Sequence, residues 1–348
     1  MSVTRGVGAL SPGRLDIQQM DRPAGNPLKA LARRAANRAM QRLVTASMRG
    51  VLAAEAQGPQ ALLRETERQR RIHMRFDAPV VARVDAEAIR QLGPGADLPP
   101  PPAPAEWFAP RSAVPRGVVF YVHGGSFVAE RSPRITHLVA RFAAAAEARV
   151  FAPSYRLAPE NPCPAAVEDI VAAWAWQCET APDEPVVALA ESAGAGILLA
   201  ALQAAAARGL PRPAGLVLLS PWVDLSLQSW SVTAASLLAT TPYTMESLAL
   251  MARFYLNGRA ATDPVASPIF GRFDGFPPTL IHASRGDILY DDAVRLAEAM
   301  RDRGCDLTVR LWAEETHVWE RMQTPKARQS ITLAADFIRR RLDAAVEH

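Results

Sequence analysis

The pattern of apolar positions changes about one third of the way along the chain. From residue 118 onward, short runs of strand-forming residues alternate with segments of helix length. The strand-like runs are Val118–His123, Ala148–Pro153, Pro185–Ala190, Ala214–Ser220, Thr279–Ser284 and Leu307–Trp312. The helix-length segments are 134–147, 164–179, 193–208 and 290–303, with a final helix near 325–346. Strands that alternate with helices are typical of a parallel sheet covered on both faces, so the pattern predicts the α/β class.

The N-terminal region has a different pattern, with apolar and basic positions at helical spacing. Apolar residues recur on one side from about Pro27 to Val51, while the arginines lie mainly on the other side. A second helix is expected near Pro59–Phe76. A basic amphipathic helix can lie on an anionic membrane, or it can pack on the main domain as part of a lid. The absence of a long apolar run favours the lid.

Two irregular stretches suggest how the chain is organised. A proline-rich connection holds at most one short strand, Ala105–Phe108, because proline forbids helix and disfavours central strands. The interval from Trp222 to Pro278 is too long for one crossover and contains a helix near Thr244–Leu256. An insertion there would lie above the strand ends, where α/β sheets place their sites. We expect a helical cap segment over 1–80 and a catalytic domain over 81–348, with a cap insertion within 222–278.

Composition narrows the possible functions. The net charge of +4 is uneven, because residues 1–76 hold fourteen Arg and Lys against five Asp and Glu. This basic segment has no nucleic-acid motif, so nucleic-acid binding is not expected. The apolar stretches are too short for stable membrane insertion, and no secretory signal is evident, so we expect a cytoplasmic protein. Three scattered cysteines indicate neither a zinc site nor a disulfide framework.

A serine stands where one predicted strand runs directly into a helix. The segment from Ala190 to Gly194 places these two small residues two positions either side of Ser192. This is the geometry of a nucleophile elbow, whose sharp turn exposes the serine hydroxyl and whose small neighbours avoid a clash between strand and helix. The alternative is an ordinary serine cap in the first turn of a helix.

A glycine pair follows the first strand, in YVHGGSF from Tyr121 to Phe127. Consecutive glycines let the backbone turn its N–H groups toward one point, as a tetrahedral oxyanion requires. The candidate oxyanion-hole residues are Gly124, Gly125, Ser126 and, from the elbow, Ala193. Alone, the pair would be equally consistent with an ordinary Gly-Gly turn. Its place upstream of the elbow favours the oxyanion hole.

Of the six histidines, His317 is the best candidate for a base. It follows the last predicted strand and precedes the last helix, whereas His123 belongs to the glycine loop and is expected to brace it. The orienting acid should follow the preceding strand, and Asp287 is nearest to that strand end. Asp291 and Asp292 stand where the next helix begins and are expected to cap it. The order serine, aspartate, histidine is that expected of the fold in which such elbows occur.

Six segments resemble bacterial esterases related to hormone-sensitive lipase, within the α/β-hydrolase superfamily. They are HGGSF, SYRLAPENPCPAAVEDI, AESAGAG, LLSPWVDLS, GDILYDDAVRLAEAM and THVW, and they cover roughly Val80 to Arg340. The resemblance implies an α/β-hydrolase fold, with a mostly parallel central sheet flanked by helices and a helical cap. It implies that the serine, aspartate and histidine above form the triad, and that the oxyanion donors match Gly125 and Ser126. It further implies a short-acyl ester or lactone substrate and no cofactor, with a homodimer as a family-level expectation.

Four positions depart from the family's pattern. Ser126 replaces the loop's third glycine, Ala190 the elbow's first glycine and Ala195 a later one, and Glu191 stands where aspartate is common. Ser126 still has a backbone N–H to donate, so catalysis is compatible with this change. Its side chain is expected to narrow the acyl pocket or to add a hydrogen bond.

These features predict a serine carboxylic ester hydrolase that acts through an acyl-enzyme. Four aromatic residues are candidate pocket walls, with ordinary core packing as the alternative: Phe127, Trp222, Tyr243 and Trp319. An amidase or peptidase on the same fold would share the triad, but the chain has no propeller repeats to restrict peptides. A non-catalytic receptor, similar to plant gibberellin receptors, would lack the histidine that is present here as His317.

Overall fold

The computed structural model describes residues 13–21, 27–81, 89–92, 100–110 and 114–347. Within these ranges, nine strands form one sheet in the order β1-β9-β8-β7-β6-β4-β5-β3-β2. The strands are β1 Leu15–Gln19, β2 Ile89–Leu92, β3 Ala105–Pro110, β4 Val118–Val122, β5 Arg149–Pro153, β6 Val186–Glu191, β7 Gly215–Leu219, β8 Thr279–Ser284 and β9 Leu307–Trp312. From β1 to β5 in this order the pairs are parallel, and β3 and β2 add an antiparallel edge. The predicted α/β class with a mostly parallel sheet is confirmed.

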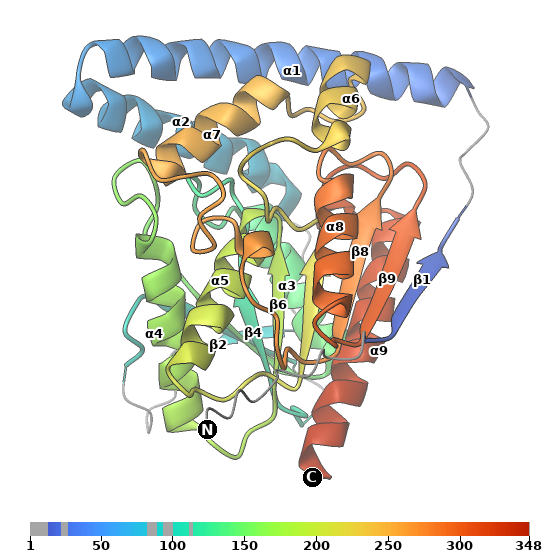
Figure 1. Ribbon diagram of the computed structural model, residues 1–348. Coiled ribbons are helices and arrows are strands. Elements are labelled where there is room, and N and C mark those ends of the chain that lie inside the picture. Colours follow the sequence, from blue (N-terminus) through green and yellow to red (C-terminus); the bar gives the residue numbers. More distant parts are fainter. Residues whose placement is uncertain (1–12, 22–26, 82–88, 93–99, 111–113, 348) are drawn as a thin grey trace, which may run out of the picture.

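Helices cover both faces of the sheet (Figure 1). On β4, Phe120 packs into one apolar core and Tyr121 into the other, because successive strand side chains point to opposite faces. One face is covered by α4 Ala165–Thr180, α5 Ala193–Ala207 and α8 Tyr290–Arg301, and the other by α3 Pro133–Ala146 and α9 Pro325–Val346. A strand buried on both faces needs apolar residues throughout, which is why its position could be predicted from sequence.

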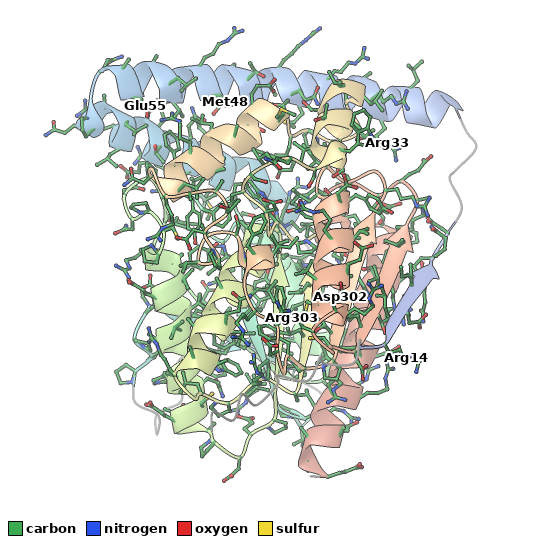
Figure 2. All side chains as sticks on the ribbon, viewed as in Figure 1. Arg14, Arg33, Met48, Glu55, Asp302 and Arg303 are labelled. Carbon is green, nitrogen blue, oxygen red and sulfur yellow. The ribbon has the colours of Figure 1, made fainter. Side chains whose placement is uncertain are left out.

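Four more helices lie beyond the carboxyl ends of the strands, at the top of Figure 1. They are α1 Pro27–Ala56, α2 Pro59–Val81, α6 Trp230–Leu238 and α7 Met245–Leu256. Figure 2 labels Arg33, Met48 and Glu55 along α1. Arg33 donates to the carbonyl of Glu314 at 2.6 Å, and Glu55 pairs with Arg253 of α7 at 2.7 Å. The long helix α1 therefore contacts both α7 and the loop that follows β9. No helix among the described residues is both long and apolar enough to cross a membrane.

The sequence pattern misses three elements, namely β1, β2 and α6. The strand β1 lies inside the region 1–80, for which only a helical cap is expected, yet Leu15 pairs with Leu307 of β9 in a parallel ladder. Its residues alternate in burial at the edge of the sheet, so it has no continuous apolar run. The helical segment therefore begins after this strand. Residues 82–88, next to the expected boundary at 80 and 81, lie outside the described ranges.

Candidate active site

Ser192 occupies the turn between β6 and α5, with φ 52° and ψ −130°. A left-handed φ at a residue other than glycine costs about 1–3 kcal/mol and persists only where the surroundings hold it. The N–H of Ser192 donates to the carbonyl of Leu219 at 3.0 Å. A Cβ at Gly194 would lie 2.4 Å from the carbonyl oxygen of His123, so only glycine fits there. The backbone thus has the strained, close-packed geometry of a nucleophile elbow.

The side chains of Ser192, His317 and Asp287 form one chain of hydrogen bonds. His317 Nε2 lies 2.8 Å from Ser192 Oγ, and His317 Nδ1 lies 3.0 and 3.1 Å from the two carboxylate oxygens of Asp287. Burial opposes ionisation of Asp287, but the charge and hydrogen bond of His317, with donors from Ser220 and Leu289, hold its pKa below the ordinary value. An ionised carboxylate therefore faces Nδ1, and Nε2 is directed at the serine hydroxyl.

The glycine loop turns sharply beside Ser192. Three consecutive residues have positive φ: Gly125 at 128°, Ser126 at 53° and Phe127 at 67°. The two residues other than glycine each add strain of about 1–3 kcal/mol. The turn closes through hydrogen bonds from the N–H groups of Val128 and Ala129 to the carbonyl of Gly125. We call residues 125–129 the oxyanion turn, after the oxyanion donors that the sequence predicts in it.

One candidate oxyanion donor has another partner. The N–H of Gly124 donates to Glu191 Oε1 at 3.1 Å, so this donor, which the sequence suggested for the oxyanion, is already engaged. A Cβ at Gly124 would lie 2.9 Å from Ser192 Cβ, which shows how closely this residue approaches the elbow. Gly125, Ser126 and Ala193 remain as candidate donors.

Glu191 forms hydrogen bonds with three segments of the site, a role that the sequence pattern did not predict. Besides the Gly124 N–H, its carboxylate accepts from Tyr121 Oη at 3.0 Å and from Arg321 Nε and Nη2 at 2.8 and 2.7 Å. Burial opposes the charge, but Arg321 and these hydrogen bonds lower the pKa of Glu191. The pair could have been suspected, since Glu191 precedes Ser192 and Arg321 follows His317 by four residues. Each would otherwise be an expensive buried charge.

The four predicted pocket aromatics lie in three different settings. Phe127 is buried, stacks on Tyr255 at 4.0 Å between ring centroids and contacts Trp222 at 5.2 Å. Tyr243 is partly exposed and meets His317 edge-on at 5.4 Å. Trp319 packs with Trp312 in a separate core cluster, so the core alternative applies to it.

His123 is buried beside the oxyanion turn. Its ring stacks on Tyr155 at 4.3 Å, and Tyr155 Oη donates to the His123 carbonyl at 2.7 Å. Burial lowers the pKa of His123 to about 4, so the ring is neutral at physiological pH. These contacts agree with a bracing role.

Asp291 and Asp292 lie in the first turn of α8, as expected, but their side chains bond elsewhere instead of capping the helix. Asp292 Oδ2 accepts from the N–H groups of Val223 and Asp224, both at 3.0 Å, and Asp291 Oδ2 accepts from Ser231 N at 2.8 Å. These N–H groups belong to the long connection after β7. The two carboxylates therefore join that connection to the first turn of α8, where negative charge is also favourable for the helix dipole. In the described part of the chain, no group of three His, Cys, Asp or Glu is placed to hold a metal ion.

Comparisons with known proteins agree with this geometry. Residues 119–321 match the family model described as alpha/beta hydrolase fold. An acetyl-hydrolase of Streptomyces hygroscopicus is 39% identical over 241 residues, which cover 68% of this chain and 79% of that protein. An esterase structure from the bacterial hormone-sensitive lipase family superposes with a TM-score of 0.72 at 31% identity and covers 80% of this chain and 92% of that one.

A second solved structure was obtained with an ester present. It is the esterase EstE5 soaked with p-nitrophenyl butyrate, with a TM-score of 0.69 and 31% identity over 78% of this chain and 91% of that one. The family match spans more than half of the chain, and the relatives in sequence and structure are ester hydrolases. The chain therefore belongs to the α/β-hydrolase family and is a carboxylic ester hydrolase of the bacterial hormone-sensitive-lipase type.

Proposed function

We propose that Ser192 is the nucleophile, His317 the general base and Asp287 the orienting acid of this hydrolase. The observation that supports the proposal is the unbroken hydrogen-bond chain from Asp287 through both nitrogens of His317 to Ser192 Oγ. The strained elbow adds support, because it presents the serine hydroxyl at the carboxyl edge of the sheet.

The reaction proceeds in two halves. Ser192 Oγ attacks the ester carbonyl carbon, its proton passes to His317 Nε2, and the carbonyl electron pair moves onto the oxygen. The tetrahedral species collapses to the acyl-enzyme, and the imidazolium returns the proton to the departing alcohol. Water then repeats the attack, and the acid leaves as Ser192 is restored. Asp287 fixes the imidazole tautomer and stabilises its charged form.

The N–H groups of Gly125, Ser126 and Ala193 are proposed to bind the oxyanion. Backbone donors held in place before the reaction stabilise a developing negative charge without reorganisation. The positive φ values of Gly125 and Ser126 support this, because such a turn directs successive N–H groups to one side.

The substrate is proposed to be a small ester with a short acyl chain, or a lactone. Phe127, within the oxyanion turn, and Trp222, which contacts it, are both buried, and Ser126 places a side chain where the family has glycine. The relative named acetyl-hydrolase and the structure soaked with p-nitrophenyl butyrate support short acyl groups. Rates on a series of p-nitrophenyl esters from acetate upward, together with simple lactones, test this. A maximum at long acyl chains would contradict it.

We propose that α1, α2 and the segment 222–278 form a cap over this site. Support comes from the position of α1, α2 and, within that segment, α6 and α7 beyond the strand ends in Figure 1, and from the polar contacts of α1 described above. A cytoplasmic location is also proposed, because Cys163, Cys178 and Cys305 are all free thiols, as a reducing compartment would keep them. Fractionation of the native host tests the location.

A further inference from the structure

The oxyanion turn is held from outside by the cap helix α2. Ser126 and Phe127 both have left-handed φ, a conformation that neighbouring contacts must stabilise. One contact comes from the loop after β5, where the N–H of Ala158 donates to the carbonyl of Phe127 at 3.0 Å. A further contact comes from Arg70 of α2.

The guanidinium of Arg70 contacts two loops at once. Its Nε donates to the carbonyl of Val128 at 2.7 Å, and its Nη2 donates to the carbonyl of Ala158 at 2.9 Å. Nη1 and Nη2 also donate to the two carboxylate oxygens of Glu160, each at 2.8 Å. The Arg70 side chain is only 15% exposed, and its bonds to the two carbonyls are partly buried, whereas the pair with Glu160 is exposed. Arginine suits this place, because its rigid fork of donors bonds to several acceptors in a fixed geometry.

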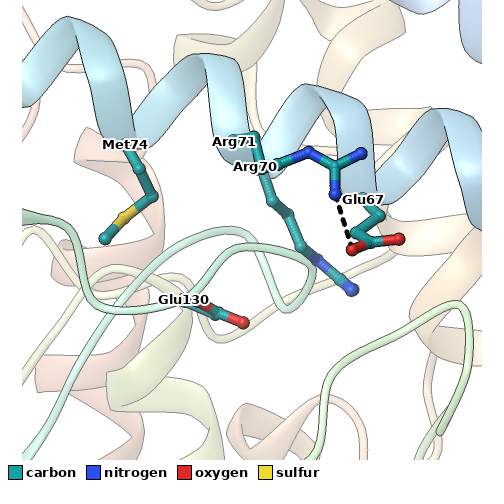
Figure 3. A pocket seen from close by; sticks show the side chains of 5 residues that line it. All are labelled: Glu67, Arg70, Arg71, Met74 and Glu130. Atoms are coloured by element: carbon teal, nitrogen blue, oxygen red, sulfur yellow. Dashed lines mark hydrogen bonds and ion pairs between the residues drawn. The ribbon is translucent and has the colours of Figure 1, made fainter.

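The neighbouring arginine on the same helix is bound differently. Arg71 pairs with Glu67 one turn away at 2.7 Å, and both side chains are 61% exposed. Figure 3 shows this pair joined by a dashed line, with Arg70 and Arg71 directed differently from α2. A hollow of about 350 Å³ is lined by residues of α2, Arg70 and Arg71 among them, and by Glu130, which follows the oxyanion turn. Beside this hollow, Arg70 bonds α2 directly to the oxyanion turn.

We propose that Arg70 is a positioning residue through which the cap helix α2 holds the oxyanion turn in its reactive conformation. The proposal rests on the proposed function, since it takes Gly125 and Ser126 to be oxyanion donors. Arg70 acts through Val128, which lies within the turn, and Ala158, which bonds to it, and Arg70 does not touch the reacting atoms. The cap would then contribute to transition-state stabilisation as well as covering the site.

The test compares Arg70→Met with Arg71→Met. Methionine keeps an unbranched apolar side chain and removes the guanidinium. One readout is kcat and KM for p-nitrophenyl butyrate. The other is the inhibition constant of a trifluoromethyl ketone, whose carbonyl carbon accepts Ser192 Oγ while the proton passes to His317 and the carbonyl oxygen becomes an oxyanion.

We expect Arg70→Met to lower kcat roughly 10- to 100-fold with KM near the wild-type value, because small misplacement of oxyanion donors affects mainly the transition state. The inhibition constant should rise by a similar factor. Arg70→Lys should lie between, since an ammonium group keeps the charge but not the fork of donors. Arg71→Met should leave both readouts unchanged. A loss that merely reflected lower stability would not raise the inhibition constant of the folded enzyme.

Three results would overturn the proposal. They are an unchanged inhibition constant in Arg70→Met, an equal effect in Arg71→Met, or a rise in KM at unchanged kcat. If Arg70→Met does not fold, Arg70→Lys decides, and a wild-type inhibition constant there overturns the proposal. Failure of the proposed function looks different, because the wild-type enzyme itself would then not bind the ketone.

Discussion

Ser192, His317 and Asp287 lie at the carboxyl edge of the sheet, whereas Ser330, His282 and Glu320 form a second group of the same chemical types inside the core. His282 Nδ1 lies 2.7 Å from Ser330 Oγ, and Ser330 donates to Glu320 Oε1 at 2.7 Å. All three are fully buried. We refer to Ser330, His282 and Glu320 as the core group.

The two groups differ in the order of their contacts. His317 stands between serine and acid and uses a different nitrogen for each. In the core group the serine is the middle member, and His282 Nε2 has no hydrogen-bond partner among the described residues. His282 Nδ1 also lies 3.7 Å from Glu320 Oε1, so the serine and the acid are both on one nitrogen, and the acid does not orient the other nitrogen toward the serine for proton transfer.

The backbone differs as well. Ser192 lies on a strained turn next to the oxyanion turn, while Ser330 lies within the regular helix α9. A serine inside a helix has no free N–H groups beside it, because they bond to the preceding turn. Residue types and short distances therefore do not make a catalytic centre, which also needs the elbow and the oxyanion donors.

The largest expected effect is the loss of Ser192 or His317. Ser192→Ala and His317→Ala should each lower kcat by roughly 10⁴–10⁶, with the fold intact by circular dichroism, because each removes a group that the chemical step uses. Steady-state rates on p-nitrophenyl butyrate provide the measurement, and Ser330→Ala is the matched control. Near-normal turnover in either active-site variant would refute the assignment.

Loss of the acid is expected to be almost as severe. Asp287→Asn should lower kcat by about 10⁴, because an amide permits the wrong tautomer of His317. Asp291→Asn serves as the control, since Asp291 bonds to the backbone of Ser231 instead. Kinetics of both variants on the same ester separate the two roles. If Asp291→Asn does the damage and Asp287→Asn does not, the acid is misassigned.

A small effect is expected at Ser126. Ser126→Gly retains the backbone N–H and should leave kcat within about tenfold of wild type, whereas loss of an oxyanion donor costs roughly 10²–10³. Glycine also adopts the positive φ of this position freely. A hundredfold loss in a folded variant would show that the Ser126 hydroxyl itself takes part in catalysis.

The core group should affect stability and leave catalysis almost untouched. Ser330→Ala leaves His282 and Glu320 without their shared partner, which should lower the free energy of unfolding by about 1–3 kcal/mol. Urea unfolding measures this, and kcat per folded molecule should stay near the wild-type value. A large loss of kcat would mean that the core group directly supports the loop that carries His317.

The core histidine also predicts a pH dependence of stability. Burial lowers the pKa of His282 below the ordinary value of 6.5, so below that pH the unfolded chain binds a proton that the folded chain does not. The free energy of unfolding should therefore fall as pH drops through 6.5 toward the lowered pKa. His282→Asn should weaken this fall, and urea titrations at two pH values on both proteins would detect the difference.

The sequence predicted two features best, namely the buried strands and the hydrogen-bonded residues Ser192, His317 and Asp287. Runs such as Thr279–Ser284, which is buried throughout, and Leu307–Trp312, where buried and half-buried residues alternate at first, have the predicted bounds, because burial favours regularly placed apolar residues. The edge strand β1 lacks such burial and was missed. For Glu191 and Arg321 the only signal in the sequence is their position near Ser192 and His317. The role of Arg70 depends on which loops meet in space, and no local pattern reports that. The side-chain partners of Asp292 were missed for the same reason, since Val223 and Asp224 lie almost seventy residues away.

Labelling by an alkyl fluorophosphonate tests the central claim most directly. An activated serine displaces fluoride through its oxygen and keeps the phosphonyl group, so mass spectrometry of the digested protein locates the reactive residue. We expect one label, on Ser192, which is absent from Ser192→Ala and strongly reduced in His317→Ala, while Ser330→Ala labels as the wild type does. Labelling of a different serine, or undiminished labelling of Ser192→Ala, would contradict the account.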